Sequence, residues 1–398
     1  LELLPALPES PERDRHELHI KITLGPPLIH IKGYQSSDTI SAYERAHKLS
    51  LKLGEREELS AILFGLWVIN NTGAKHSMAL DWADQALEHA AQDDNVVALM
   101  IARRLHGMTL LHTGYLREAN TDLEKSIALY DPDRHRDLAY RFAQDPEVAA
   151  GVFLSWTMWL QGYADQALRT ADKASNRAKS IKHTNTSLWA LCYGGAFIAS
   201  WCGHLELAEQ NLRDLTDQSK VSGILLHEMS AKILNGWLQA KKGIRDLTNE
   251  MQDALANLHG NKFRLWTPVF LSMMSESHLG FGRADAGKRL IDQALAFVAE
   301  TEERMTEAEL HRIKGACLGA IGNDAGAEES YVAAIAVARR QHAKSWELRA
   351  ATSLAGLWQS QGRRKEAQDL LAPVYNWFTE GFDTTDLKDA KALLEELK

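Results

Sequence analysis

Residues 162–174 read GYADQALRTADKA, and variants of this phrase occur six more times along the chain. Each begins with a glycine, most carry a small residue five positions later, and apolar residues follow at helical spacing. The other copies are GYLREANTDLEKSI from Gly114, GHLELAEQNLRDL from Gly203, GIRDLTNEMQDAL from Gly243, GRADAGKRLIDQA from Gly282, GNDAGAEESYVAA from Gly322 and GRRKEAQDLLAPV from Gly362. Their glycines are 48, 41, 40, 39, 40 and 40 residues apart. A regular period of about 40 predicts a solenoid of stacked units.

Each unit is predicted to be a helix, a turn that holds the glycine, and a second helix. Glycine suits the turn because it tolerates a left-handed backbone at a helix end. The small residue five positions later is expected where the two helices cross most closely. Two looser copies, around 36–46 and 74–86, extend the pattern upstream. The expectation is therefore about eighteen helices in nine units, with no sheet.

The spacing of small residues distinguishes between known repeat classes. Glycine recurs seven residues before the turn glycine at Gly107, Gly236 and Gly315. This phrase is typical of tetratricopeptide repeats, although HEAT-like helix pairs share the longer period. The unit exceeds the ~34 residues of the standard repeat by roughly one and a half helical turns. The predicted fold class is an all-α, right-handed superhelix of tetratricopeptide-like helix pairs.

Three domain segments are expected. Residues 1–12 form a leader or linker, 13–378 form the superhelix of about nine helical hairpins, and 379–398 form a C-terminal capping helix. That last helix is predicted from about Thr384 to Leu397, with Asp383 or Thr384 capping its start. Because the chain begins at Leu1 and not at Met, we expect it to be a piece of a longer protein.

Two motifs look catalytic or nucleotide-binding at first sight. GRADAGKRL, residues 282–290, differs by one residue from a phosphate-binding loop, because Arg289 stands where Ser or Thr would bind magnesium. No strand pattern precedes it, and the repeat already explains Gly282 and Gly287. HRDLAYRF, residues 135–142, resembles a kinase catalytic loop but has Phe142 at the metal-binding Asn position. A structural kink between units is the favoured interpretation there, and a functional loop is the alternative.

Composition restricts the function classes further. The formal charge is −8 over 398 residues and no block of Lys or Arg stands out, so nucleic acid is not an expected partner. Three cysteines without C-x-x-C spacing favour reduced thiols in the cytoplasm. The uncharged stretch 184–203 is interrupted by Gly194 and Gly195, which favours a buried helix over a membrane span. Neither a metal, a cofactor nor a catalytic residue is predicted.

Aromatic residues gather on the face predicted to be concave. In this repeat class the first helix of each unit lines that face, at positions two, six and ten residues before the turn glycine. In the later units the same face is more polar, with Glu276 and Arg312 on it and Glu309 and Gln359 alongside. One interpretation is a groove for a peptide or small ligand, and the other is that the aromatics only fill space between long helices. The candidate groove residues are Trp156, Trp159, Tyr193, Phe197, Trp201, Trp237, Glu309 and Arg312.

Three stretches carry a family resemblance. Residues 303–318 (ERMTEAELHRIKGACL) and 343–397 resemble the C-terminal end of large bacterial signalling proteins, and 130–168 is similar to the middle of the same region. Those proteins join a class III adenylate/guanylate cyclase domain, or a winged-helix DNA-binding domain, to a P-loop ATPase and then to repeats. The resemblance implies that the cyclase and ATPase parts lie upstream of this chain, since none of their motifs is present in it.

Two functions follow as hypotheses. The first is a non-catalytic module that binds a protein or peptide partner and relays its occupancy to upstream domains of the same polypeptide. The alternative is a small-molecule sensor that binds its ligand in the inner channel of the superhelix. An enzyme is disfavoured, because the sequence shows no convergent polar site.

Overall fold

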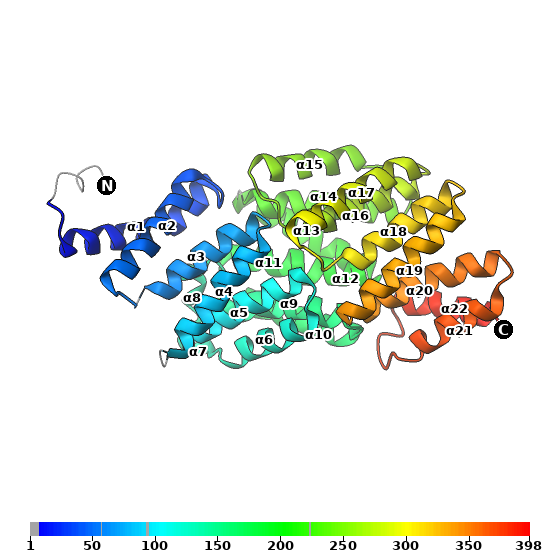
Figure 1. The fold of residues 1–398 in the computed structure, drawn as a ribbon, viewed down its shortest axis with the longest axis horizontal. Helices are drawn as coiled ribbons and strands as arrows, with labels where there is room; N and C mark the ends of the chain where they lie inside the picture. Colours follow the sequence, from blue (N-terminus) through cyan, green and yellow to red (C-terminus); the bar gives the residue numbers. More distant parts are fainter. Residues whose placement is uncertain (1–7, 57, 93–94, 223) are drawn as a thin grey trace.

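The computed structural model describes residues 8–56, 58–92, 95–222 and 224–398, and within them it contains helices and turns but no strand. The helices form nine pairs, called units 1–9 below (Figure 1). The units are α1 (Pro11–Lys32) with α2 (Ser37–Leu53), α3 (Leu59–Thr72) with α4 (His76–Gln92), α5 (Val96–Thr113) with α6 (Leu116–Ala128), α9 (Pro146–Leu160) with α10 (Ala164–Ile181), α11–η2–α12 (Thr184–Trp201) with α13 (Leu205–Ser222), α14 (Leu225–Lys241) with α15 (Thr248–Gly260), α16 (Thr267–Gly280) with α17 (Ala284–Thr301), α18 (Glu307–Ala320) with α19 (Asp324–Gln341), and α20 (Lys344–Ser360) with α21 (Arg364–Tyr375).

The turn glycines occupy the positions that the repeat predicts. All seven have a left-handed backbone, with φ between 64° and 96°. A side chain would strain this conformation, so glycine is favoured wherever the first helix of a unit gives way to the second.

The two helices of each unit cross closely, which explains why small residues recur at the crossing. Ala119, Ala167, Ala208, Ala327 and Ala367 are fully buried in their second helices. The glycines seven residues before the turn complete the contact from the first helix. A Cβ atom at Gly107 would lie 2.9 Å from Leu123, and those at Gly236 and Gly315 would lie 2.5 and 2.6 Å from Met251 and Tyr331. The helices of a unit can therefore approach closely only because these positions lack bulk.

Irregular segments interrupt the array in two places. The eight extra residues between the glycines at 114 and 162 form two short helices, α7 (Pro132–His135) and α8 (Leu138–Arg141). The predicted buried helix at 184–203 contains a π-helical turn, η2 (Ala190–Ala196). Gly194 and Gly195 lie in that turn, where a Cβ atom would meet Val152 and Asn211 at 3.3 and 2.6 Å. No helix among the described residues is long and apolar enough to cross a membrane.

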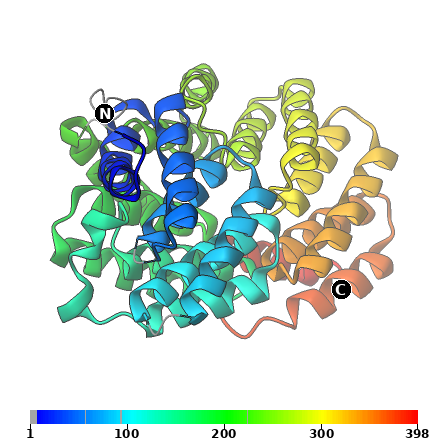
Figure 2. The ribbon, with the colours of Figure 1, turned by 60° about the vertical axis from the view of Figure 1, so that its left-hand side comes forward.

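Successive turns of the superhelix pack on each other, because later units contact units five places earlier (Figures 1 and 2). In three cases the backbone carbonyl at the end of a first helix accepts a hydrogen bond from the start of the unit five places on, and in the fourth it accepts one from the start of the C-terminal helix that follows unit 9. The four contacts are Leu265 N–H to Thr72 O at 3.2 Å, Met305 N–H to His112 O at 3.1 Å, Ser345 Oγ–H to Trp159 O at 2.5 Å, and Thr385 N–H to Cys202 O at 3.4 Å. The inner faces of early and late units consequently meet in one large core.

The first and last helices each begin at a defined residue. Helix α1 begins at Pro11, where Ser10 accepts a hydrogen bond from the Arg13 N–H. Most of the expected leader, residues 1–7, lies outside the described residues. The last helix, α22 (Thr385–Glu396), packs against α20 and α21. Thr384 occupies its N-cap position, but the Thr384 hydroxyl donates to the Gly381 carbonyl and does not cap the helix.

Candidate functional site

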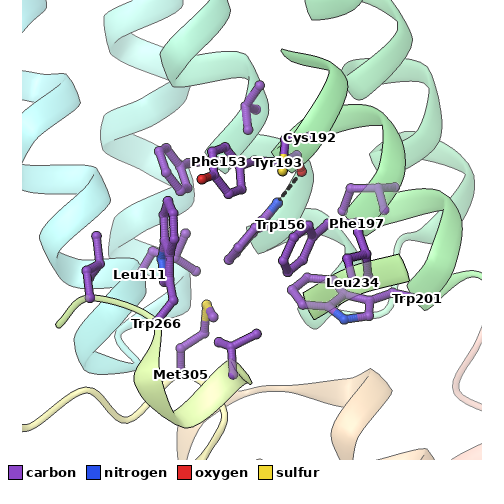
Figure 3. Close-up of a cluster of buried hydrophobic side chains, with 14 of the residues drawn as sticks. Leu111, Phe153, Trp156, Cys192, Tyr193, Phe197, Trp201, Leu234, Trp266 and Met305 are labelled. Atoms are coloured by element: carbon purple, nitrogen blue, oxygen red, sulfur yellow. Dashed lines mark hydrogen bonds between the residues drawn. The ribbon is translucent and has the colours of Figure 1, made fainter. Parts of the chain in front are cut away.

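The structure buries all six aromatic candidates and brings the rings of five of them, all but Trp237, into contact inside the core. Their exposed fractions are between 0% and 4% for Trp156, Trp159, Tyr193, Phe197, Trp201 and Trp237. Figure 3 shows several of them converging with Trp266 from a later unit. The ring centroid of Trp156 lies 5.3 Å from that of Phe197 and 4.9 Å from that of Trp201.

The five aromatics other than Trp237 form a packed interior and not an open groove, because the later units cover them. The ring of Trp266, just before α16, lies 4.5 Å from Tyr193, and the ring of Trp346 on α20 lies 4.8 Å from Trp159. The indole N–H of Trp156 donates to the Tyr193 carbonyl at 2.7 Å (Figure 3). A ligand could reach this cluster only if the two turns of the superhelix separated.

Trp237 is placed differently from the other five. Its indole N–H donates to Glu276 Oε2 at 2.8 Å, and the ammonium group of Lys241 lies 4.8 Å from the centre of its ring. Trp237 also borders a cavity of about 520 Å³ between the C-terminal ends of α14 and α16. The cavity is lined by Trp237, Ala240, Lys241, Lys242, Gly243, Glu276, Ser277, Leu279 and Gly280.

The two charged candidates belong to a series of ion pairs beside this cavity. Arg312 contacts Glu276 Oε1 at 2.8 Å and Glu309 Oε2 at 2.7 Å. Arg349 then contacts Glu309 Oε1 at 3.1 Å and Asp386 Oδ2 at 2.8 Å, which links α16, α18, α20 and α22. Of the candidates, Trp237, Glu309 and Arg312 therefore lie at or next to the cavity.

Glu276 and Arg312 keep their charges at ordinary pH. Burial opposes ionisation of Glu276, but the cations of Lys241, Arg312 and Arg349 outweigh it and lower the pKa of Glu276 to about 2. Burial also opposes the charge on Arg312, yet Glu309 and Glu276 hold the pKa of Arg312 above its usual value. Each carboxylate oxygen of Glu276 accepts from a fixed donor, so this residue forms a rigid polar wall.

Sequence reasoning missed Arg349, although the repeat contained a signal for it. Glu309 and Arg349 both lie thirteen residues before a turn glycine, in units 8 and 9. Extending the inward positions by one more helical turn would have placed them on the same face. Lys241 and Asp386 had no comparable signal, because their roles depend on contacts between units.

The stretch that resembles a phosphate-binding loop (282–290) and the one that resembles a kinase catalytic loop (135–142) both have structural roles. Gly282 is a turn glycine with φ of 73°, and a Cβ atom at Gly287 would lie 3.0 Å from the Ser275 carbonyl oxygen. Lys288 pairs with Asp292 at 2.7 Å on the half-exposed side of α17. In the kinase-like segment, Phe142 is buried against Phe64 with ring centroids 5.2 Å apart. The described residues include no group of three or more acidic, His or Cys side chains suited to a metal ion.

Comparisons with known proteins show that the chain resembles solved structures in its fold. No protein-family model matches the chain, and no curated protein sequence matches it either. A crystal structure of a Rap protein complexed with Competence and Sporulation Factor has a TM-score of 0.61, at 13% identity over 96% of this chain and 99% of that one. A Rap conjugation gene regulator of plasmid pLS20, in complex with the Phr* peptide, has a TM-score of 0.48, at 10% identity over 96% and 95%. Yeast Tom70 has a TM-score of 0.42, at 12% identity over 96% of both chains.

These observations confirm the predicted fold class. The nine helix pairs, their period of about 40 residues and the likeness to the first Rap structure identify an all-α superhelix of tetratricopeptide-like helix pairs. Because the sequence identity is only 13%, this similarity shows a shared fold alone.

Proposed function

We propose that the chain is a non-catalytic module that binds a protein or peptide partner at the cavity beside Trp237. The observation that carries this proposal is the cavity itself. Its volume of about 520 Å³ falls within the ~300–1,000 Å³ of typical ligand sites. The side chain of Leu279, the fixed carboxylate of Glu276 and the cation of Lys241 line it and offer an anchor for one or two side chains.

The fold supports a binding role for the same surface. Repeat superhelices present the first helices of consecutive units as one continuous surface. The cavity lies between two such helices, α14 and α16, which belong to units 6 and 7. The Rap protein with the similar fold was solved with Competence and Sporulation Factor bound, which favours recognition over catalysis as the use of such a surface.

The wider context is part of the proposal. By its family resemblance, the module belongs to a cytoplasmic bacterial signalling protein whose cyclase or winged-helix domain and ATPase precede the repeats. Occupancy of the cavity would then be relayed to those upstream domains. The ion-pair series from Glu276 to Asp386 supports such a relay, because it connects the cavity wall to four helices.

The test fills the cavity without disturbing the core. Gly280 ends α16 on the cavity wall, and a Cβ atom there would meet only the Ala240 carbonyl oxygen, at 4.0 Å. Random-peptide display on the wild-type protein should enrich peptides that Gly280→Leu no longer binds. Gly260→Leu is the matched control, because Gly260 ends α15 with open space around it and away from the cavity. Equal binding to all three proteins would refute the proposed site.

A small-molecule sensor is the second candidate. It is favoured by a smaller void of about 20 Å³, which lies behind Trp237 and Glu276 and reaches Trp201, Trp346 and Arg349. Such a void could accept one extra group of a compact ligand that occupies the main cavity. Native mass spectrometry of the protein purified from its own cells separates the candidates. A bound small molecule that Gly280→Leu lacks would favour the sensor.

A further inference from the structure

His112 bridges the seam, the line of contacts where the two superhelical turns meet, with both its backbone and its side chain. Its carbonyl accepts the Met305 N–H at 3.1 Å, and its Nε2 accepts the indole N–H of Trp266 at 3.2 Å. Its Nδ1 lies 3.2 Å from Asn71 Oδ1, so Nδ1 carries the imidazole proton and Nε2 is the acceptor. Phe153 of α9 packs on the ring as a further uncharged neighbour. This fully buried position therefore fits a neutral imidazole in one tautomer.

Trp266 is held in a strained backbone conformation at the same seam. Its φ is 64°, in the left-handed region that a bulky side chain rarely adopts. Such strain persists only where surrounding contacts enforce it. Those contacts include the bond to His112 and the bond from the Trp266 backbone N–H to Glu303 Oε1, which is 2.9 Å long. Loss of the His112 acceptor would let the residues before α16 relax.

The Trp266 ring covers the aromatic inner face of the early units (Figure 3). Its centroid lies 4.5 Å from that of Tyr193, 5.9 Å from that of Trp156 and 6.3 Å from that of Phe153. All four side chains are buried in the closed arrangement. Movement of Trp266 would therefore uncover an apolar surface that no ligand can reach while the seam is closed.

Two titratable groups among the described residues stand beside this contact. The His76 ring lies 5.5 Å from that of His112, and His76 Nε2 lies 3.4 Å from Glu303 Oε2. Burial and His76 together hold the pKa of His112 well below its usual value. Burial raises the pKa of Glu303, but His76, the Trp266 N–H and the half-exposed cation of Arg264 offset part of that rise.

We propose that His112 and Trp266 form a proton-operated latch that holds the two superhelical turns together over the aromatic inner face. A proton on Nε2 of His112 would point at the indole N–H of Trp266, and neither group could then accept a hydrogen bond. It would also place a charge in the core. The latch then opens: Trp266 relaxes, the Met305 bond to His112 breaks, and water reaches the imidazolium.

Acid favours the open state of this latch. The closed seam holds His112 neutral, while a hydrated imidazole titrates near ~6.5. The open state therefore takes up the proton first, and opening becomes more favourable as the pH falls below ~6.5. A proton on Glu303 has the opposite effect, because the closed seam favours the neutral carboxyl. The pKa shift at His112 is the larger of the two, so the net effect of acid is release.

Amide hydrogen exchange, resolved by residue with mass spectrometry, tests the latch in the wild-type protein. Protection factors at Leu265, Met305 and Thr385 are compared at pH 7 and pH 5. Leu265 and Met305 donate across the seam beside the latch, whereas Thr385 donates to the Cys202 carbonyl further along the same seam. Protection at Leu265 and Met305 should fall about fivefold or more at pH 5, and protection at Thr385 should change by less than about twofold.

Three variants assign the effect to the imidazole. His112→Gln removes the titration but keeps an acceptor for the Trp266 indole N–H, so the selective fall should disappear. Glu303→Gln removes the opposing carboxyl and should enlarge the fall. His227→Gln is the matched control, because His227 is also fully buried with a lowered pKa but contacts Asn185 in the neighbouring unit. It should keep the selective fall.

A hydrophobic dye gives a second measurement without any substitution. Anilinonaphthalene sulfonate fluorescence should rise between pH 7 and pH 5 while the helical circular dichroism signal stays constant, because the aromatic inner face is uncovered without loss of the helices. The wild-type exchange pattern decides the matter even if a variant fails to fold.

Three results would overturn the latch. They are an equal fall in protection at all three amides, which indicates general unfolding, a selective fall that survives His112→Gln, and unchanged protection beside the latch at pH 5. None of them bears on the cavity beside Trp237, which the display experiment judges separately.

Discussion

The backbone N–H of Met305 donates a hydrogen bond to the backbone carbonyl of His112, 3.1 Å away, and joins unit 8 to unit 3. The contact matters because neither residue belongs to the repeat phrase. It is one of four such bonds, of which three join units five places apart and the fourth joins α22 to unit 5, and together they bring the inner faces of two superhelical turns together. The aromatic inner face of the early units is therefore core, and the accessible cavity is displaced to the ends of α14 and α16.

Trp156→Ala should lower the free energy of unfolding by roughly 3–5 kcal/mol. Trp156 is fully buried, and its indole N–H satisfies the Tyr193 carbonyl. Urea denaturation followed by circular dichroism measures the change. Trp377→Ala is the control, because Trp377 is 37% exposed and should cost clearly less. Equal losses in the two variants would contradict the placement of Trp156 in the core.

Gly287→Leu should destabilise the protein by about 1–3 kcal/mol or more, because the added side chain meets the Ser275 backbone. Lys288→Ala should change stability by about 0.5 kcal/mol or less, since the Lys288–Asp292 pair is half-exposed. Denaturant midpoints of both variants test this. If Lys288→Ala abolished measurable ATP binding, the phosphate-loop interpretation of residues 282–290 would have to return.

Glu380→Ala should loosen the contact between the C-terminal segment and unit 4. Glu380 accepts hydrogen bonds from the backbone N–H of Gln166 at 3.0 Å and from its side chain at 2.9 Å. Cys202, whose carbonyl bonds to Thr385, lies beneath this segment. Losing ~1–2 kcal/mol of local stability should speed thiol labelling of Cys202 about tenfold.

The other two thiols serve as internal references for that experiment. Cys192 and Cys317 are buried away from the segment and should keep their slow labelling. Glu395→Ala, on the exposed face of α22, should leave all three rates unchanged. A uniform increase at the three cysteines would indicate global destabilisation instead of a local opening.

Stability should fall as the pH drops below about 6.5. Burial lowers the pKa of His227 to about 3 in the folded protein, while an unfolded histidine titrates near ~6.5. The unfolded state therefore takes up this proton first, and the folded state loses about 2 kcal/mol relative to it between pH 6.5 and 5. Burial lowers the pKa of His112 as well, which adds a loss of the same sign.

His227→Gln isolates the first of these contributions. Glutamine cannot be protonated, yet its amide can still donate to the Asn185 oxygen that the imidazole of His227 contacts at 2.8 Å. The difference in unfolding free energy between pH 7 and pH 5 should shrink by about 2 kcal/mol in this variant. An unchanged pH dependence would show that folding does not lower the pKa of His227.

The repeat phrase alone determined the helix pairs and their turns. Glycine at 282 and at the six equivalent positions indicates a left-handed turn, and small residues such as Ala327 indicate a close crossing. These features are local, because helix periodicity and turn geometry act over a few residues. The same locality explains why the repeat pattern was sufficient to assign Gly287 to a helix crossing and to separate it from a phosphate loop.

Only the tertiary structure decided which inner-face residues remain near an opening. Trp156 and Trp237 both lie six residues before a turn glycine, so their sequence positions are equivalent. Trp156 is enclosed by aromatic rings from its own and later units, whereas Trp237 contacts Glu276 and borders the cavity. The physical reason is cumulative rotation: a small turn per unit, summed over five units, determines which faces meet. No single repeat encodes that sum.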